Sequence, residues 1–275
     1  MKGTGKLLVA ICFITLISSC QKEYSFENNG TKWVDPQALA FIDSSGITDS
    51  LQQNAVNNLV IQLKSDSLWS KFLALYPMVG GTPGSTKWNL KDPRDLDAAF
   101  RLTFYGSPLF SAGGVLFATL SDYASTHFTD NLLSYNNASI AYYSTTQNSS
   151  SGYDMGCDDN VAPYNELAIY EAYDASDWFG YYKFGWTPAN TAGLFMFSAT
   201  ANNVERYENG VVADQKGASP TNAYTNLPIL LGKVANAAAG GKRQCSFAAI
   251  GEGLSDNEAL AFYNDVQAFE TQLGR

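Results

Sequence analysis

The chain is poor in the side chains from which most catalytic and metal sites are built. It has one histidine, His127, and four cysteines in 275 residues. A histidine-based triad could use only His127, no Gly-x-Ser-x-Gly elbow is present, and a zinc site would lack ligands. Phosphate-binding loops and dinucleotide fingerprints are absent as well. These absences argue against the common hydrolase, zinc and nucleotide-dependent classes.

Long apolar runs are also missing. The longest, Leu7 to Ile17, is broken only by Thr15 and is shorter than the roughly twenty residues of a spanning helix. Lys2 and Lys6 precede it, and such a charged start with a short apolar run indicates a secretory signal. The exit Ile17-Ser18-Ser19-Cys20 resembles a lipobox. We expect residues 1–19 to be a signal peptide, Cys20 to be lipidated and residues 20–34 to be a flexible polar tether. An ordinary signal peptide with a chance cysteine is the alternative.

The residues after Cys20 bear on the location. Cys20-Gln21-Lys22-Glu23 resembles the surface-export signal of Bacteroidetes lipoproteins, although Tyr24 stands where another acid is usual. This resemblance implies an outer-membrane protein at the cell surface and leaves the periplasmic face open. The lipid would be the contact with the membrane.

Positive charge is scarce in the mature chain. The formal charge is −9, and it becomes −11 when Lys2 and Lys6 leave with the signal peptide. An acidic surface without a basic stripe repels nucleic acid, so we expect no nucleic-acid partner.

Two cysteines remain in the mature domain. Cys157 and Cys245 form an even pair in a compartment that permits disulfides, and we predict that they are bonded. Two buried thiols are the alternative.

Residues 35–78 are predicted to be a helical lead-in. Asp35-Pro36 begins a helix through Ile42 that Gly46 ends, and Thr48 caps a second helix with apolar residues at helical spacing from Leu51 to Leu63. A third helix is predicted from Leu68 to Tyr76.

Residues 79–275 are predicted to form an antiparallel β-sandwich that a C-terminal helix closes. Turn residues recur about every ten residues between short β-branched or aromatic runs. Asn209-Gly210 indicates a tight type I′ hairpin, and Ser255 with Glu258 forms a capping box for the last helix. The expected strands are Ala99–Phe104, Val115–Phe117, Ser139–Ser144, Leu167–Tyr173, Phe179–Phe184, Gly193–Ala199, Val204–Glu208, Val211–Asp214, Ile229–Gly232 and Gln244–Ile250.

Several of these motifs support a family resemblance. Tyr207-x-Asn209-Gly210 resembles the hairpin of laminin-G-like, concanavalin-A-like jelly rolls, and the stretch from Cys245 to Glu258 resembles their closing strand and helix start. Leu90 to Leu102, with the helices before it, resembles a unit of Bacteroidetes and phage structural proteins. The resemblance implies a mostly β jelly roll with N-terminal helices and a C-terminal helix. It implies little about function, since lectins, adhesins, glycosidases and inert spacers share this sandwich.

The acidic residues are the remaining candidates for a catalytic or metal site. The glucanase pattern Glu-x-Asp-x-x-Glu is absent. Asp95 and Asp97 have the right spacing, but Arg94 and Arg101 beside them indicate ion-paired turn residues. Asp154, Asp158, Asp159 and Asn160 could bind calcium in a loop, because hard cations prefer clustered oxygen ligands. The alternative is that they are ordinary turn residues.

Aromatic residues are dense between Tyr164 and Trp186, where nine of 23 residues are Phe, Tyr or Trp. Sugars stack on such rings. We predict a ligand face with Trp178, Tyr181 and Trp186, and Asp174 and Asp177 as hydrogen-bond acceptors. Tyr181 and Trp186 share a face only if the strand bends or bulges between them, which Gly185 allows. The alternative is that all these rings are buried.

Together these features predict a non-catalytic surface lipoprotein that binds glycan or another surface ligand. No cofactor is expected, apart from the calcium considered above. A concanavalin-A-like glycoside hydrolase or lyase, and a purely structural module, are the two alternatives.

The anchor gives a direct prediction. Cys20→Ala should release the protein from membranes, because no other residue can receive the thioether. Partition into detergent measures this, and a variant that still partitions like the wild type would contradict the lipoprotein assignment.

Overall fold

The computed structural model describes most of the chain from Val34 onward. The described residues are 34–146, 152–159, 166–169, 175–179, 182–186, 192–218, 224–235 and 240–275, with the backbone alone for 175–179 and 182–186. Within these ranges, no helix is long and apolar enough to span a membrane.

The first of two antiparallel sheets has eight strands in the described chain. Seven follow the order β13-β12-β11-β6-β15-β4-β3, and β1 pairs with the far end of β15. The bounds are β1 Phe72–Tyr76, β3 Leu109–Ser111, β4 Gly114–Leu116, β6 Ala138–Ser144, β11 Gly193–Ala199, β12 Asn203–Glu208, β13 Val211–Gly217 and β15 Gln244–Gly251.

The second sheet has seven described strands in the order β10-β9-β8-β7-β14-β5-β2. The bounds are β2 Thr103–Tyr105, β5 Tyr123–Thr129, β7 Met155–Asp158, β8 Glu166–Ile169, β9 Ala175–Phe179, β10 Tyr182–Trp186 and β14 Pro228–Leu231. The predicted sandwich with helices at both ends is therefore confirmed.

The central strands of the eight-stranded sheet are buried on both faces. Every residue of β6 and β11 is buried. Alternate residues enter two different cores: Ile140 and Phe195 face the second sheet, whereas Ala141 and Leu194 face the helices. Burial on both faces explains why these strands read as continuous apolar runs and not as alternating ones.

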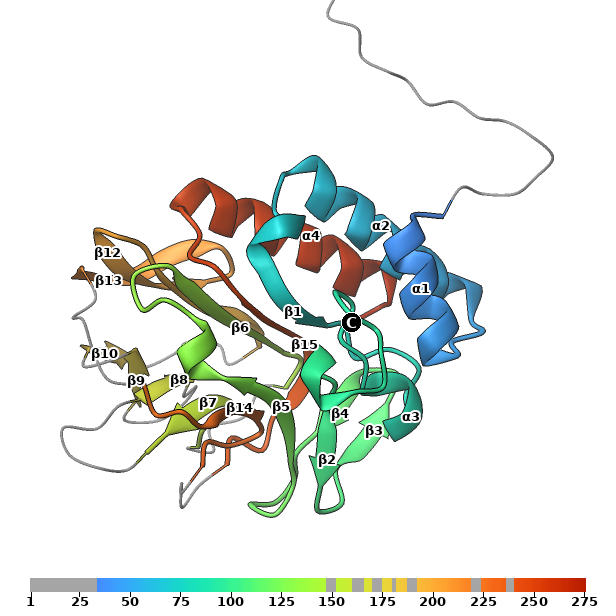
Figure 1. Cartoon of the computed structure of the whole chain (residues 1–275), viewed down its shortest axis with the longest axis horizontal. Coiled ribbons are helices and arrows are strands. Elements are labelled where there is room, and N and C mark those ends of the chain that lie inside the picture. Colours follow the sequence, from blue (N-terminus) through green and yellow to red (C-terminus); the bar gives the residue numbers. More distant parts are fainter. Residues whose placement is uncertain are drawn as a thin grey trace, which may run out of the picture. The chain divides into compact units, whose positions relative to one another are not determined.

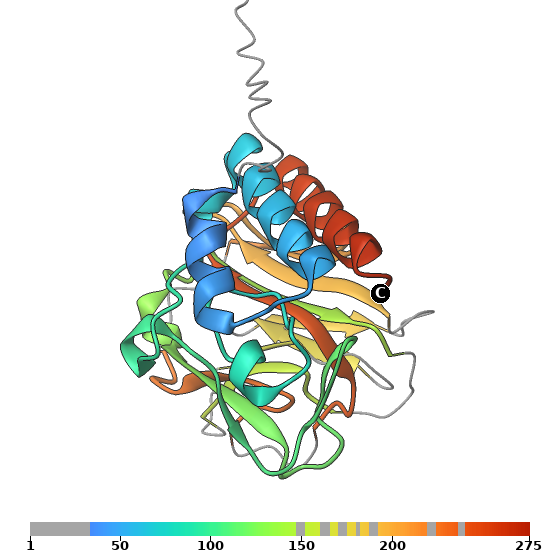
Figure 2. The same cartoon turned by 90° about the vertical axis from the view of Figure 1, so that its right-hand side faces the viewer.

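Helices form a third layer over the eight-stranded sheet (Figures 1 and 2). These are α1 Pro36–Ser45, α2 Ser50–Ser65 and α4 Asp256–Gln272, and a short α3 spans Pro83–Thr86. Phe262 of α4 contacts Phe72 and Phe247, with ring centroids 4.4 and 6.1 Å apart. Three 3-10 turns, Trp69–Lys71, Asp97–Ala99 and Asp130–Leu132, complete the elements of the described chain.

Local sequence signals correctly predicted several helix ends and one hairpin turn. Pro36 begins α1 and Gly46 ends it at φ 65°, and the Ser255–Glu258 capping box opens α4. Asn209 and Gly210 have φ 51° and 76°, as a type I′ hairpin requires.

Other predictions were wrong. The helix expected over Leu68–Tyr76 is a 3-10 turn followed by β1, because this run pairs with β15 and buries four of its five strand residues. Asp49 and not Thr48 caps α2. The strand expected over Phe179–Phe184 is two strands, β9 and β10, and β3, β5 and β7 were missed.

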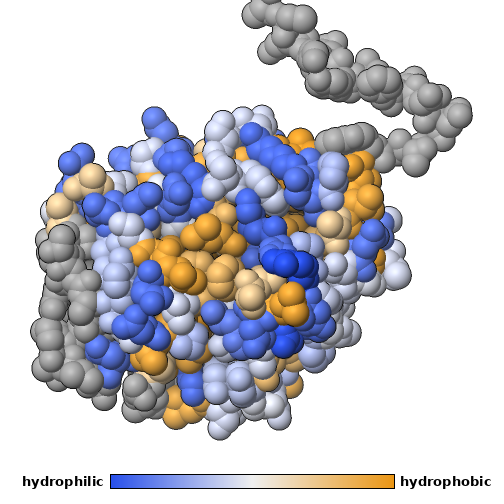
Figure 3. Space-filling model, in the orientation of Figure 1, coloured by the Kyte–Doolittle hydropathy of each residue, from blue (hydrophilic) through white to orange (hydrophobic). Residues whose placement is uncertain are grey.

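The surface carries few exposed apolar groups. Figure 3 shows a mainly hydrophilic face with apolar side chains gathered near its centre. Among the described residues, Val211 and Leu109 are the most exposed large apolar side chains, at 64% and 59%, and they lie on the two edge strands β13 and β3. Single exposed apolar residues such as these two are normal on protein surfaces.

The contact between α2 and α4 predicts a dependence of stability on pH. Asp265 of α4 is buried beside Asp66, and burial, followed by the charge and hydrogen bond of Asp66, raises the Asp265 pKa to about 7. The folded state thus holds a proton that the unfolded chain releases near pH 4. This contribution to stability is complete below pH 4 and is lost as the pH rises through 7.

Asp265→Asn should therefore gain stability relative to the wild type between pH 5 and pH 8. Urea unfolding at each pH measures the difference, and Asp43→Asn, at an exposed position of α1, is the matched control. A constant difference between Asp265→Asn and wild type would contradict the assignment.

Candidate functional site

The outer face of the seven-stranded sheet carries none of the three long helices. Figures 1 and 2 show α1, α2 and α4 on the far side of the eight-stranded sheet, so none of these helices covers the outer face of the seven-stranded one. The pairing places Thr103, Ser125, Leu230, Gly156 and Ala168 in one outward row across that sheet. Within this row Thr103, on β2, is half-buried and the other four residues are buried. Their neighbours Ala124, Leu231 and Leu167 belong to the inner core.

An aromatic stack lies at the β2 edge of this sheet. Tyr105 on β2 and Tyr123 on β5 are direct cross-strand partners, and their rings stack with centroids 4.6 Å apart and planes 10° apart. Lys233 Nζ lies 3.9 Å from the Tyr123 centroid. Because Tyr105 occupies one face of the Tyr123 ring, the cation must approach from the other. Tyr105, 42% exposed, therefore ends the stack with its outer face open.

Polar groups continue this line along the same two strands. Thr103 is two residues from Tyr105 and shares its face, and its Oγ1 hydrogen-bonds His127 Nε2 at 2.7 Å. Asp97 Oδ1 lies 3.5 Å from the same nitrogen and is also paired with Arg101 at 2.9 Å. We call Thr103, Tyr105, Tyr123 and His127 the β2–β5 strip.

His127 reaches this position through a backbone irregularity. The β5–β14 register shifts between Thr129 and Ser125, and His127 has φ 56° within the bulge. A non-glycine residue in this region is strained, and bulges re-aim side chains beside functional sites. The bulge directs the one histidine of the chain toward Thr103.

The strip has the chemistry of a sugar-binding surface. An open tyrosine ring can stack on the C–H face of a pyranose, while hydroxyl and imidazole groups beside it can bond the hydroxyl edge. The sequence did not reveal the strip because β5 was not recognised. The one available signal was the alternation Tyr123-x-Ser125-x-His127.

The sequence-predicted ligand face lies where no side chains are described. Asp174 and Tyr181 fall outside the described residues, and Asp177, Trp178 and Trp186 have a described backbone only. Trp178 pairs with Lys183, and Trp186 pairs with Ala175, in a register that runs regularly through Gly185. The expected bulge at Gly185 is therefore absent, and the two tryptophans occupy rows of opposite parity. The ligand contacts themselves stay a prediction.

The predicted disulfide is wrong. Cys157 lies on β7 and Cys245 on β15, in different sheets, and both keep their thiols. Both side chains are fully buried in the core between the two sheets. The Cys157 thiol lies near Asp130 and Thr225, and burial raises its pKa, while Cys245 Sγ lies 3.5 Å from the Phe247 carbonyl oxygen.

The predicted calcium ligands that the structure describes have different structural roles. Asp154 and Arg243 form a buried ion pair at 2.6 Å, and Asp158 lies within β7, opposite Glu166. Asp159 follows the strand, and Asn160 lies outside the described residues. Across the described ranges, no three His, Cys, Asp or Glu side chains form a metal-binding group. Calcium therefore stays a prediction without a described cluster.

Asp95 and Asp97 are ion-paired turn residues, as expected. Arg101 lies 3.3 Å from Asp95 and 2.9 Å from Asp97, and Arg94 pairs with Asp92.

A carboxylate pair with a more suggestive geometry lies elsewhere. Tyr207 Oη is 2.7 Å from Glu205 Oε2 and 2.8 Å from Asp256 Oδ1, at a pocket of about 360 Å³. The two acids are thus within about 5.5 Å, the spacing of a retaining glycosidase. However, the buried Tyr207 hydroxyl bonds both carboxylates and stands between them. Burial, followed by these carboxylates, raises the Tyr207 pKa. The trio ties β12 to the start of α4.

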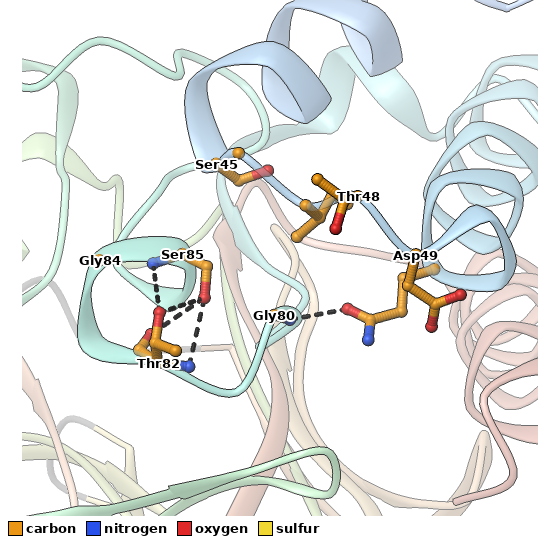
Figure 4. A pocket seen from close by; sticks show the side chains of 10 residues that line it. Ser45, Thr48, Asp49, Gly80, Thr82, Gly84 and Ser85 are labelled. Carbon is orange, nitrogen blue, oxygen red and sulfur yellow. Dashed lines mark hydrogen bonds between the residues drawn. The ribbon is translucent and has the colours of Figure 1, made fainter.

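Figure 4 shows a third candidate, a polar pocket of about 370 Å³ between the α1–α2 loop and the loop before α3. Gly80 donates its N–H to Gln52 Oε1 at 2.7 Å, and the Thr82 and Ser85 hydroxyls bond each other at 2.8 Å. Gly80 is required because a Cβ there would lie 2.2 Å from Ser85 Oγ. None of the ten lining residues is aromatic, so this pocket offers hydrogen bonds without a stacking surface.

Comparison with known proteins shows similarity at the level of the fold. The chain matches no protein-family description and no curated protein sequence. A mutant sialidase of Trypanosoma rangeli with trans-sialidase activity is similar at 8% identity and TM-score 0.55, over 79% of this chain and 39% of that one. The sialidase of the same organism with sialic acid bound gives 7% identity and TM-score 0.50, over 76% and 38%.

Domain 4 of an extracellular arabinanase from Geobacillus stearothermophilus, in complex with arabinotriose, is similar at 16% identity. Its TM-score is 0.49, over 70% of this chain and 98% of that one. The chain thus spans well under half of the two sialidases and nearly all of this domain. At such low identities the likeness to the sialidases establishes a shared β-sandwich fold and nothing further.

The positive φ of His127 gives a prediction at this site. A left-handed conformation costs a residue with a Cβ roughly 1–2 kcal/mol, and glycine is free of this cost. His127→Gly should therefore be more stable than His127→Ala by about 1 kcal/mol in urea unfolding.

The matched pair is Thr129→Gly and Thr129→Ala at the end of the same strand, where φ is −86°. There the alanine variant should be the more stable. The same order at both positions would show that the bulge does not form.

Proposed function

We propose that this protein is a non-catalytic, lipid-anchored surface protein whose sandwich binds glycan through the β2–β5 strip. The observation that carries the proposal is the open face of Tyr105 at the end of the Lys233–Tyr123–Tyr105 stack. The stack restrains this ring at the β2 edge of the sheet, so we expect little loss of side-chain entropy when a sugar binds.

The fold likeness agrees with this proposal without establishing it. The sialidase bound to sialic acid is an example of this sandwich in a protein that acts on sugars. The lipid on Cys20 would hold the domain at the outer membrane, where glycans of other cells or of the medium are within reach.

A glycosidase is the alternative that one specific observation favours, the close pair Glu205 and Asp256. We favour binding without hydrolysis, because the Tyr207 hydroxyl occupies the space in which the reacting carbon would have to lie. Incubation with polysaccharides and chromogenic glycosides should release no sugar. Turnover that disappears in Glu205→Gln would favour the enzyme.

Tyr105→Ala tests the binding site. It should weaken binding on an array of neutral and acidic oligosaccharides at least about tenfold, equivalent to ~1.4 kcal/mol, because the stacking surface is lost. Its melting temperature should stay within a few degrees of wild type, since the ring is exposed.

Two further variants sharpen this test. Tyr105→Phe keeps the ring and should keep binding, and Leu132→Ala, at a 53% exposed position on the turn after β5, controls for the loss of an exposed side chain. Equal array binding by Tyr105→Ala and wild type would contradict the proposed site.

A further inference from the structure

Another pocket lies on the side of the eight-stranded sheet that the helices cover. It has a volume of about 310 Å³ and is formed where α4 passes the ends of β6 and β11 and the β12–β13 turn. Tyr143, Asn209, Tyr263 and Gln267 supply its aromatic and amide groups. The two sheets separate this pocket from the β2–β5 strip.

The hairpin turn and α4 build this pocket together. A Cβ on Gly210 would lie 2.8 Å from Tyr263 Cβ, so only glycine lets the turn approach the helix this closely. A Cβ on Gly193 would lie 2.3 Å from Asn209 Oδ1. The Asn-Gly turn thus does more than reverse the chain, because it brings an amide beside a tyrosine ring.

The polar groups of the pocket are held in fixed orientations. Tyr143 Oη donates to Gln267 Oε1 at 2.9 Å, and Gln267 Nε2 donates to Thr271 Oγ1 at 3.2 Å. Leu194 N donates to Asn209 Oδ1 at 3.0 Å, which fixes the amide so that Asn209 Nδ2 is a donor. Gln267 lies one helical turn beyond Tyr263, so both residues face the turn.

The one charged lining residue is occupied by internal contacts. Arg275 Nε lies 3.0 Å from Glu270 Oε2, and its other nitrogens donate to the carbonyl oxygens of Pro77, Met78 and Ala112. Its side chain is 5% exposed. The pocket therefore presents a tyrosine ring, amides and hydroxyls without an available charge.

We propose that this pocket is a second carbohydrate site that takes one neutral sugar ring, so that each chain binds two glycan ends. The inference rests on the proposed function and deepens it. The sugar ring lies against Tyr263, and the amides of Asn209 and Gln267 bond its hydroxyls. With two sites on opposite sides of the sandwich, one chain can bridge two glycan strands.

Calorimetric titration of the mature protein tests this inference. The probes are neutral trisaccharides of glucose, galactose, mannose and xylose. Wild type should bind two molecules per chain, whereas Tyr263→Ala and Tyr105→Ala should each bind one and the double variant none. Tyr263→Phe should keep both sites, and Gln267→Met should weaken the second site about tenfold while leaving the fold intact.

The outcomes separate the two proposals. Suppose that wild type binds one molecule per chain, that Tyr105→Ala binds none and that Tyr263→Ala binds like wild type. This result overturns the second site and leaves the proposed function standing. Binding that only Tyr263→Ala removes supports the second site and contradicts the strip. Failure of wild type to bind any of these neutral probes overturns the inference. Binding of acidic oligosaccharides at the strip would then still support the proposed function.

Discussion

Apolar side chains project from both faces of the eight-stranded sheet. Because both sets are buried, another layer must cover each face of this sheet. One face packs on the seven-stranded sheet, and the other needs the covering that α1, α2 and α4 provide. An uncovered Leu194 or Phe247 would expose apolar surface worth about 25 cal/mol per Å². These helices do not cover the seven-stranded sheet, whose described outer row is buried except toward the β2 edge, where Thr103 and Tyr105 lie.

Two groups of polar residues with carboxylates stabilise the fold, whereas the β2–β5 strip does not. The ion pair of Asp154 and Arg243 is buried inside the sandwich. Tyr207, Glu205 and Asp256 join β12 to α4. Both groups therefore form their hydrogen bonds within the fold. Tyr105 and His127 instead lie on edge and near-edge strands, where one residue has a strained backbone and the other an exposed ring. Features that cost stability without packing benefit are the ones most readily explained by a ligand.

The sequence predicted what local signals specify. Pro36, Gly46, Asn209-Gly210 and the Ser255–Glu258 box act through their own backbone, so the ends of α1, the hairpin and α4 were correct. The run Leu68–Tyr76 suits a helix or a strand equally, and only its pairing with β15 decides between them. The strip was missed because β5 was not recognised: Tyr105 and Tyr123 meet only through the pairing of β2 with β5.

In the proposed function, ligand contacts the sheet at its β2–β5 edge. Hydrogen–deuterium exchange, measured with and without the best-binding oligosaccharide of the array, tests it most directly. The account predicts added protection over residues 103–105 and 123–127, at the edge where Tyr105 lies. Protection elsewhere with none over these two segments would contradict the account.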